Sequence, residues 1–364
     1  MLSVKALIDR IALVVSTRQP TSYRALQSAI AARSGTTVYV VDRTIKARKN
    51  EWYACLPELD PSKPTGQHFA IMVQEPTPAN LRAVLKTIED IAEIDGEVRP
   101  CLLELALDFF PRNPADPAEA LMSRERVVGL LQRHHWSAGQ GFLAHKPDAP
   151  RKVDRRQVYQ EEEMKQTRYL FSAAGDKTHS DVELHELTVR NRALNPKPGN
   201  DLYLNATVYQ GVLYAPRQIN IQHKIADQRN SDKDTLAYLP DEVRRGRVEL
   251  TLTSLETLEQ VGLKTVDDLA QCRFRKISRN LLGFRLPTCK ADGDVIKEAI
   301  TQIKTRGVYG VELKQRADNH ELRQQMKPRP RKTDRHGMGL DDWPEMNALV
   351  GDALDHLQTK WRRF

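Results

Sequence analysis

Acidic residues stand inside two otherwise apolar stretches of the sequence, and their spacing could bring carboxylates together. In the stretch 103–108, Glu104 and Asp108 fall on one face of a strand and three leucines fall on the other, because strand side chains alternate with a period of two. The stretch 247–252 repeats this arrangement with Glu249. Carboxylates are rarely buried without a partner, so these three should face water, a cation or an arginine.

The chemistry of these acids depends on whether their two strands are neighbours. If they are, Glu104, Asp108 and Glu249 converge, and a set of oxygen ligands suits Mg²⁺ or Mn²⁺. The pattern then predicts a divalent-metal site. The alternative is an ordinary solvated face on which Arg247 or Lys224 forms ion pairs with the acids.

The elements that would position these acids alternate between strands and helices in the N-terminal part of the chain. Apolar and β-branched runs predict strands at 8–15, 37–42, 68–74 and 101–110. Thr77 followed by Pro78 predicts the start of a helix between the last two strands. This order indicates an α+β fold in which helices cover one sheet.

A second group of strand signals follows at 201–209, 218–224 and 247–252, before a helix pair divided at Gly262. We therefore expect an α+β protein of two related halves, each an antiparallel sheet covered by helices. The predicted divisions are an N-terminal half (1–117), a helix with a long polar connection (118–200), a second half with the helix pair (201–315), a basic flexible linker (316–343) and an amphipathic C-terminal helix (344–364).

The positive charge of the chain is concentrated in one segment. The 364 residues include 56 Lys and Arg against 48 Asp and Glu, a formal charge of +8. Six basic residues against Asp334 give six minus one, or +5, within 323–335, where prolines alternate with cations. This segment is either an arm that binds nucleic-acid phosphates or a solvated tether. Its basic residues are Arg323, Lys327, Arg329, Arg331, Lys332 and Arg335.

Several classes of protein are excluded or disfavoured. No run of about 18 apolar residues occurs, so no membrane span is expected. The stretch 1–16 carries charges and lacks the apolar block of a signal peptide, which predicts a cytoplasmic protein. The four cysteines lack metal-binding spacing. From Pro344 onwards one apolar stripe predicts a helix that either docks on the body or pairs with a second protein.

The order of these segments resembles the rolling-circle replication initiators of plasmids and filamentous phages (the trans-acting Rep type) and the related relaxases of conjugative elements. The resemblance extends over residues 8–315. The segments that carry it are the opening strand Ile8–Val15, Leu-Glu-Leu-Ala-Leu-Asp-Phe-Phe at 103–110, Thr-Val-Tyr-Gln-Gly at 207–211, a segment ending in Lys224, Arg-Val-Glu-Leu-Thr-Leu at 247–252, and the helical stretch 259–269.

The resemblance implies that a tyrosine attacks a DNA phosphodiester and that acidic residues hold Mg²⁺ or Mn²⁺ beside it. Glu104, Asp108 and Glu249 match the acidic positions of the family, and Lys224 matches the lysine that follows the tyrosine by two residues. The tyrosine position itself falls on Gln222, which cannot be a nucleophile.

Three explanations of this substitution remain open. Tyr209 or Tyr214 has taken the role of nucleophile, the alignment is displaced, or the protein no longer nicks DNA.

These observations favour a DNA-binding protein of a mobile element that recognises a replication origin or recombination site and, if catalytic, nicks DNA with Mg²⁺ or Mn²⁺. The alternatives are a non-catalytic accessory factor in recombination, cointegrate resolution or partition, and a protein-interaction scaffold. The expected partners are double-stranded or hairpin DNA, a recombinase or helicase, and a second copy of the chain. Arg217, Lys224 and Arg247 are expected to contact DNA together with the basic segment 323–335.

Overall fold

The computed structural model describes residues 2–41, 56, 65–111, 117–137, 159–161, 166–171, 207–210, 216–224, 226–230, 235–279, 281–289, 293–303, 307–308, 311–312 and 338–364. Within these ranges the chain forms one nine-stranded sheet, a two-stranded sheet and a three-stranded sheet. Neighbouring strands of the large sheet pair antiparallel, except that the strand at Gln166–Phe171 pairs parallel with the strand at Thr207–Gln210.

The large sheet combines strands from distant parts of the sequence. From one edge to the other its strands are β2 (Val38–Val41), β3 (Gly66–Gln74), β1 (Leu2–Thr21), β4 (Arg99–Pro111), β12 (Arg245–Thr253), β9 (Arg217–Lys224), β8 (Thr207–Gln210), β7 (Gln166–Phe171) and β6 (Tyr159–Glu161). The smaller sheets are β10 (Ala226–Asn230) with β11 (Thr235–Tyr238), and β14 (Met338–Asp342), β13 (Gly283–Cys289) and β5 (His135–Trp136).

The α+β class predicted from the sequence is confirmed. The arrangement in two related halves is not confirmed, because β4 of the predicted first half pairs directly with β12 of the predicted second half. Both strands therefore belong to a single layer. The sequence also predicts that 51–56 pairs with the strand at 37–42, and of that stretch only Leu56 belongs to the described residues.

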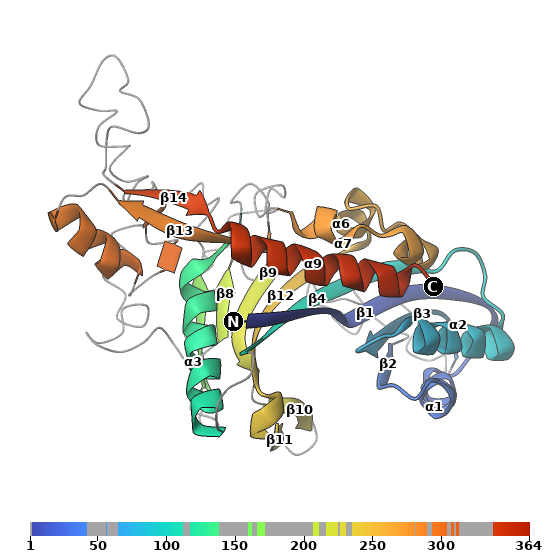
Figure 1. Ribbon diagram of the computed structural model, residues 1–364. Helices are drawn as coiled ribbons and strands as arrows, with labels where there is room; N and C mark the ends of the chain where they lie inside the picture. The colour runs from blue at the N-terminus through green and yellow to red at the C-terminus, as the bar shows by residue number, and fades with distance from the viewer. Residues whose placement is uncertain are drawn as a thin grey trace, which may run out of the picture.

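Helices cover one face of the large sheet. Figure 1 shows α9 (Pro344–Trp361) lying across the central strands, with α3 (Pro117–His134) towards one end of the sheet and α1 (Tyr23–Ser34) and α2 (Pro78–Ala92) towards the other. The principal helices and short helical turns are α1 (Tyr23–Ser34), α2 (Pro78–Ala92), α3 (Pro117–His134), η1 (Asp241–Val243), α6 (Leu255–Gln260), η2 (Val266–Gln271), α7 (Phe274–Ser278) and α9 (Pro344–Trp361). Among the described residues, none of the helices is long and apolar enough to cross a membrane.

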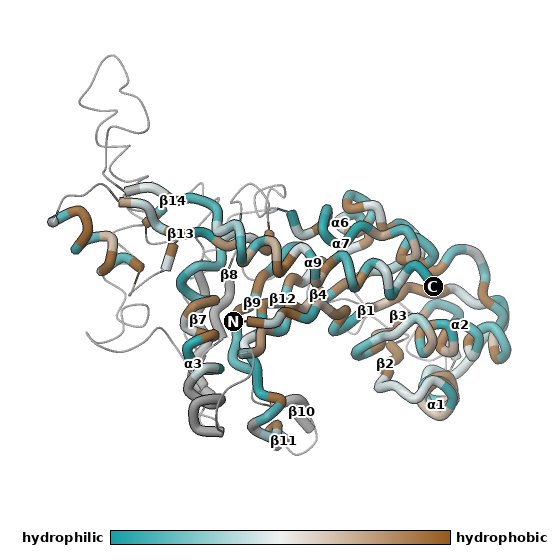
Figure 2. The backbone as a smooth tube through the Cα atoms, viewed as in Figure 1, coloured by the Kyte–Doolittle hydropathy of each residue, from teal (hydrophilic) through white to brown (hydrophobic). Residues whose placement is uncertain are grey.

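One hydrophobic core joins these helices to the sheet. Leu103, Leu105 and Leu107 of β4 belong to the same buried cluster as residues of α1, α2, α3 and α9. Figure 2 shows apolar stretches along the strands that α9 crosses. Helix α9 buries Met346 and Trp361 against this core, so of the two alternatives for its apolar stripe the structure shows docking on the body.

Helix α3 approaches the sheet closely at Gly246 of β12. A Cβ atom at this position would lie 2.9 Å from Leu131 Cδ1 and 3.0 Å from Val127 Cγ1, which is closer than van der Waals contact. The absence of a side chain therefore sets the distance between α3 and β12.

We expect Gly246→Ala to lower the free energy of unfolding by about 1–3 kcal/mol, because an added methyl group overpacks this interface. Urea denaturation followed by tryptophan fluorescence measures the change. Gly293→Ala is the control, since a Cβ there meets nothing within 4 Å. Equal stability of the two variants would show that α3 can move away at no cost.

Candidate metal centre on the polar face of the sheet

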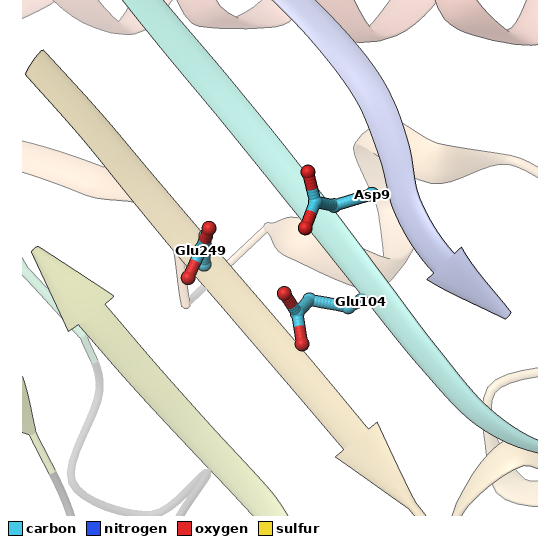
Figure 3. A group of neighbouring side chains, drawn as sticks. All are labelled: Asp9, Glu104 and Glu249. Atoms are coloured by element: carbon cyan, nitrogen blue, oxygen red, sulfur yellow. The ribbon is translucent and has the colours of Figure 1, made fainter. Parts of the chain in front are cut away.

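Three carboxylates from three adjacent strands meet on the face of the sheet opposite the core. Asp9 of β1, Glu104 of β4 and Glu249 of β12 each offer an oxygen, and these oxygens lie within 4.8 Å of one another. Figure 3 shows the three side chains grouped over the neighbouring strands. Glu104 and Glu249 are only 2% and 4% exposed. We call these three residues the carboxylate cluster.

Asp9 reaches the cluster because β1 is irregular at this point. The pairing of β1 with β4 shifts between Ile8 and Arg10, so one additional residue of β1 is accommodated there. Ile8 and Ile11 are both buried in the core, although they are three residues apart. Such a β-bulge places Asp9 and Arg10 together on the polar side of the sheet.

Arg247 connects the acids on β4, β1 and β12. Its side chain is 0% exposed. It donates two hydrogen bonds to Asp108, through Nε at 2.5 Å and Nη2 at 2.8 Å. Its Nη1 donates to Asp9 at 2.6 Å and to Glu249 at 3.3 Å. One planar guanidinium therefore fixes the positions of three carboxylates, a geometry that lysine cannot reproduce.

Two further arginines complete the network. Arg10 Nη2 donates to both carboxylate oxygens of Glu104, at 2.9 and 2.6 Å. Arg245 Nε donates to Asp108 at 2.7 Å. Asp108 thus lies with Arg245 and Arg247, outside the carboxylate cluster. The ion pairing with Arg247 that the sequence allowed as an alternative is present.

The carboxylate cluster has unusual proton affinity. Burial, together with the negative charge of Glu249, raises the pKa of Glu104 to about 8, although Arg10 opposes the shift. Burial also acts to raise the pKa of Asp9, but the charges of Arg247 and Lys224 outweigh it and lower that pKa overall. The pKa values of Glu104 and Asp9 are therefore shifted in opposite directions.

Arg247 remains charged despite its burial. Burial alone would lower its pKa, but the hydrogen bonds and the charge of Asp108 raise the pKa above its ordinary value. A permanent positive charge thus lies between the acids.

The chemistry of the cluster fits a hard divalent cation. Its donors are all carboxylate oxygens, the ligand type that Mg²⁺ and Mn²⁺ prefer. Part of the rise in the pKa of Glu104 comes from the negative charges of Glu249 and Asp9, and a cation placed among these carboxylates would be stabilised by the same charges. Arg247 and Arg10 already donate to oxygens of the same three side chains, so a bound cation has to share these carboxylates with the guanidiniums.

The remaining described residues that were predicted from the sequence are not members of the carboxylate cluster. Lys224 ends β9 opposite Arg245, and its charge acts on Asp9. Gln222, the position of the family tyrosine, is the cross-strand partner of Arg247. Arg217 begins β9, at the other end of that strand, and donates to Gln260 at 3.5 Å.

Of the two candidate nucleophiles, the structure describes the backbone of Tyr209 only. The backbone of Tyr209 pairs with Asn220, which in turn pairs with Glu249, so these positions form one cross-strand row. Tyr214 and the basic residues between 323 and 335 lie outside the described residues.

Asp9, Arg10 and Arg245 were not among the predicted site residues. Asp9 and Arg10 lie between two apolar residues spaced by three, and this spacing in a strand is the signal of a bulge that could have revealed them. Nothing local to Arg245 indicates that it binds Asp108, because that contact depends on the pairing of β12 with β4.

The chain is therefore an α+β protein whose large sheet carries two features on its polar face. These are a buried carboxylate–arginine network and a candidate site for a divalent cation. No protein-family model matches the chain, and no curated protein matches it. The resemblance to rolling-circle initiators accordingly depends on the sequence segments quoted above.

Proposed function

We propose that this chain is a cytoplasmic DNA-binding protein of a plasmid, phage or transposon, similar to a replication initiator, which recognises a specific origin or recombination site. The observation that supports it most directly is the convergence of Asp9, Glu104 and Glu249 within 4.8 Å. These three residues would hold Mg²⁺ or Mn²⁺, and the ion would supply positive charge to polarise a DNA phosphate.

The chain's own residues would divide the remaining tasks. Arg247 holds Asp9 and Glu249 in place through its Nη1 donor, and its side-chain hydrogen bonds within the described residues are all to carboxylates. Lys224 provides a positive charge close enough to act on Asp9. Tyr209, in the cross-strand row of Glu249, or Tyr214 would attack the phosphodiester.

The DNA itself would be held by basic residues away from the network. The segment 323–335 carries +5 of the formal charge and would bind phosphates without regard to sequence, and Arg217 would add a contact at the end of β9. Double-stranded or hairpin DNA is the expected ligand, with a recombinase or helicase and a second copy of the chain as candidate partners.

A second candidate function is DNA binding without nicking, in recombination, cointegrate resolution or partition. Gln222 in place of the family tyrosine favours it. The ion pairs also favour it, because Arg10 and Arg247 already neutralise much of the negative charge that would attract a metal.

The metal is tested by titrating the full-length protein with Mn²⁺ and following free Mn²⁺ by electron paramagnetic resonance. We expect the double variant Asp9→Asn, Glu249→Gln to bind Mn²⁺ at least about tenfold more weakly, a loss of about 1.4 kcal/mol. Asp267→Asn changes an exposed acid of η2 and serves as the control. Equal Mn²⁺ binding by the wild type and the double variant would remove the metal centre from the proposal.

Nicking and DNA binding without nicking are distinguished by incubating the protein with DNA that flanks its coding sequence. The DNA is supplied as a supercoiled duplex and as single strands, each with Mg²⁺ or Mn²⁺. Nicking should give a strand covalently attached to protein on denaturing gels, which Tyr209→Phe or Tyr214→Phe abolishes. Absence of any attached strand leaves the accessory function. Absence also of salt-sensitive mobility shifts would exclude DNA binding.

A further inference from the structure

A buried histidine lies on the opposite face of the sheet from the carboxylate cluster. His223 of β9 is 8% exposed and follows Ile219 and Ile221 on the core side of the strand. Among the residues that the structure describes, neither of its ring nitrogens has a hydrogen-bond partner. An unpaired buried polar group costs about 1–3 kcal/mol, so an unsatisfied imidazole in the core calls for a physical reason.

A buried arginine on α3, the helix that packs on this part of the sheet, also has an unsatisfied side-chain nitrogen. Arg124 of α3 is 8% exposed, and its Nε is buried with no hydrogen-bond partner in the described part of the chain. Arg124 precedes Val128 and Leu131 by four and seven residues, so the three share one side of the helix. That side packs on Gly246, which is the cross-strand partner of His223. Arg124 and His223 therefore face each other between α3 and the sheet.

A second guanidinium approaches from the turn before β12. Arg244 donates its Nε to the carbonyl oxygen of Leu239 at 3.0 Å. Burial, followed by the charges of Arg244 and Arg124, lowers the pKa of His223 to about 4. Lys224, its neighbour along β9, alternates to the polar face. Positive charge thus accumulates around a neutral imidazole on the core side.

We propose that Arg124, Arg244 and His223 form a binding site for a phosphate-type oxyanion. Arginine donors match the oxygens of phosphate, and an anion would satisfy the orphaned Arg124 Nε and a ring nitrogen of His223. The anion is either free phosphate or the terminal phosphate of a DNA strand. The site is separate from the carboxylate cluster and does not depend on the proposed metal or nicking activity.

Anion binding should change the ionisation of His223. A bound phosphate offsets the charges of Arg124 and Arg244, so the imidazolium form becomes less unfavourable and its pKa rises. Both ring nitrogens then become donors. Bound phosphate should therefore raise the pH at which His223 titrates.

Histidine-labelled full-length protein, titrated with pH and followed by nuclear magnetic resonance, tests the site. We expect the His223 resonance, assigned by its loss in His223→Gln, to titrate at higher pH when inorganic phosphate is present. An oligonucleotide with a 5′-phosphate is compared with the same strand ending in a 5′-hydroxyl. A response to free phosphate supports the site and identifies the anion as inorganic phosphate. A response only to the 5′-phosphorylated strand also supports the site and identifies the anion as the terminal phosphate of DNA. No response of His223 to either probe overturns it.

Arg124→Gln should weaken phosphate binding by about tenfold or more in calorimetry, the loss expected for a charge-assisted hydrogen bond. Arg126→Gln, on the exposed side of the same helix, should leave it unchanged. Equal losses in both variants would indicate a general charge effect and contradict the proposal. The resonance test on the wild-type protein stands even if Arg124→Gln does not fold.

Discussion

Arg247→Ala is expected to lower the free energy of unfolding by about 3–5 kcal/mol, the cost of removing one partner from a buried ion pair. The side chain is fully buried and donates to Asp108, Asp9 and Glu249. After its removal these acids stay in the interior without their shared counter-charge. The loss should therefore come from uncompensated buried carboxylates as well as from the cavity.

Guanidinium-chloride denaturation of the purified variants measures this effect. Arg275→Ala is the matched control, because Arg275 forms an exposed ion pair with Asp355 at 2.8 Å and such pairs contribute about 0–1 kcal/mol. Arg247→Lys should fall between the two, since it keeps the charge and loses the planar donors. A change below about 1 kcal/mol in Arg247→Ala would mean that water replaces the guanidinium without penalty.

The polar face of β4 could be predicted because alternation in a strand is a local property. Leu103, Leu105 and Leu107 lie in the core, and Glu104 and Asp108 lie together on the other side, as their spacing requires. The sequence also identified Glu249 correctly as a neighbour, on the condition that the two strands pair. That condition is met, since Arg247 pairs with Asp108 and Thr251 with Glu104.

The membership of the carboxylate cluster could not be predicted, because it depends on which strands are neighbours and on one irregular residue. Asp9 replaces Asp108 in the cluster because β1 is the other neighbour of β4 and bulges beside Glu104. A regular β1 would place Asp9 and Arg10 on opposite faces. The arginine network could not be predicted either, because Arg247 and Asp9 are far apart in the sequence and meet only across β4.

Glu104 should make the protein progressively less stable as the pH rises from about 4.5 to about 8. The ordinary pKa of its carboxyl is 4.5, and burial beside Glu249 raises the folded-state pKa to about 8. The unfolded chain therefore releases this proton at lower pH than the folded protein does. The stabilisation is complete below the unfolded pKa and is lost as the pH rises to the folded one. At about 1.4 kcal/mol per pKa unit the loss is on the order of several kcal/mol.

Glu104→Gln isolates this contribution, because the amide keeps the shape of the neutral acid and cannot ionise. Urea denaturation across this pH range should give a flatter stability profile for Glu104→Gln than for the wild type, and the variant should gain relative stability towards pH 8. Glu259→Gln removes an exposed carboxylate on α6 and should follow the wild-type profile. Parallel profiles for Glu104→Gln and the wild type would show that Arg10 keeps Glu104 ionised in the folded protein.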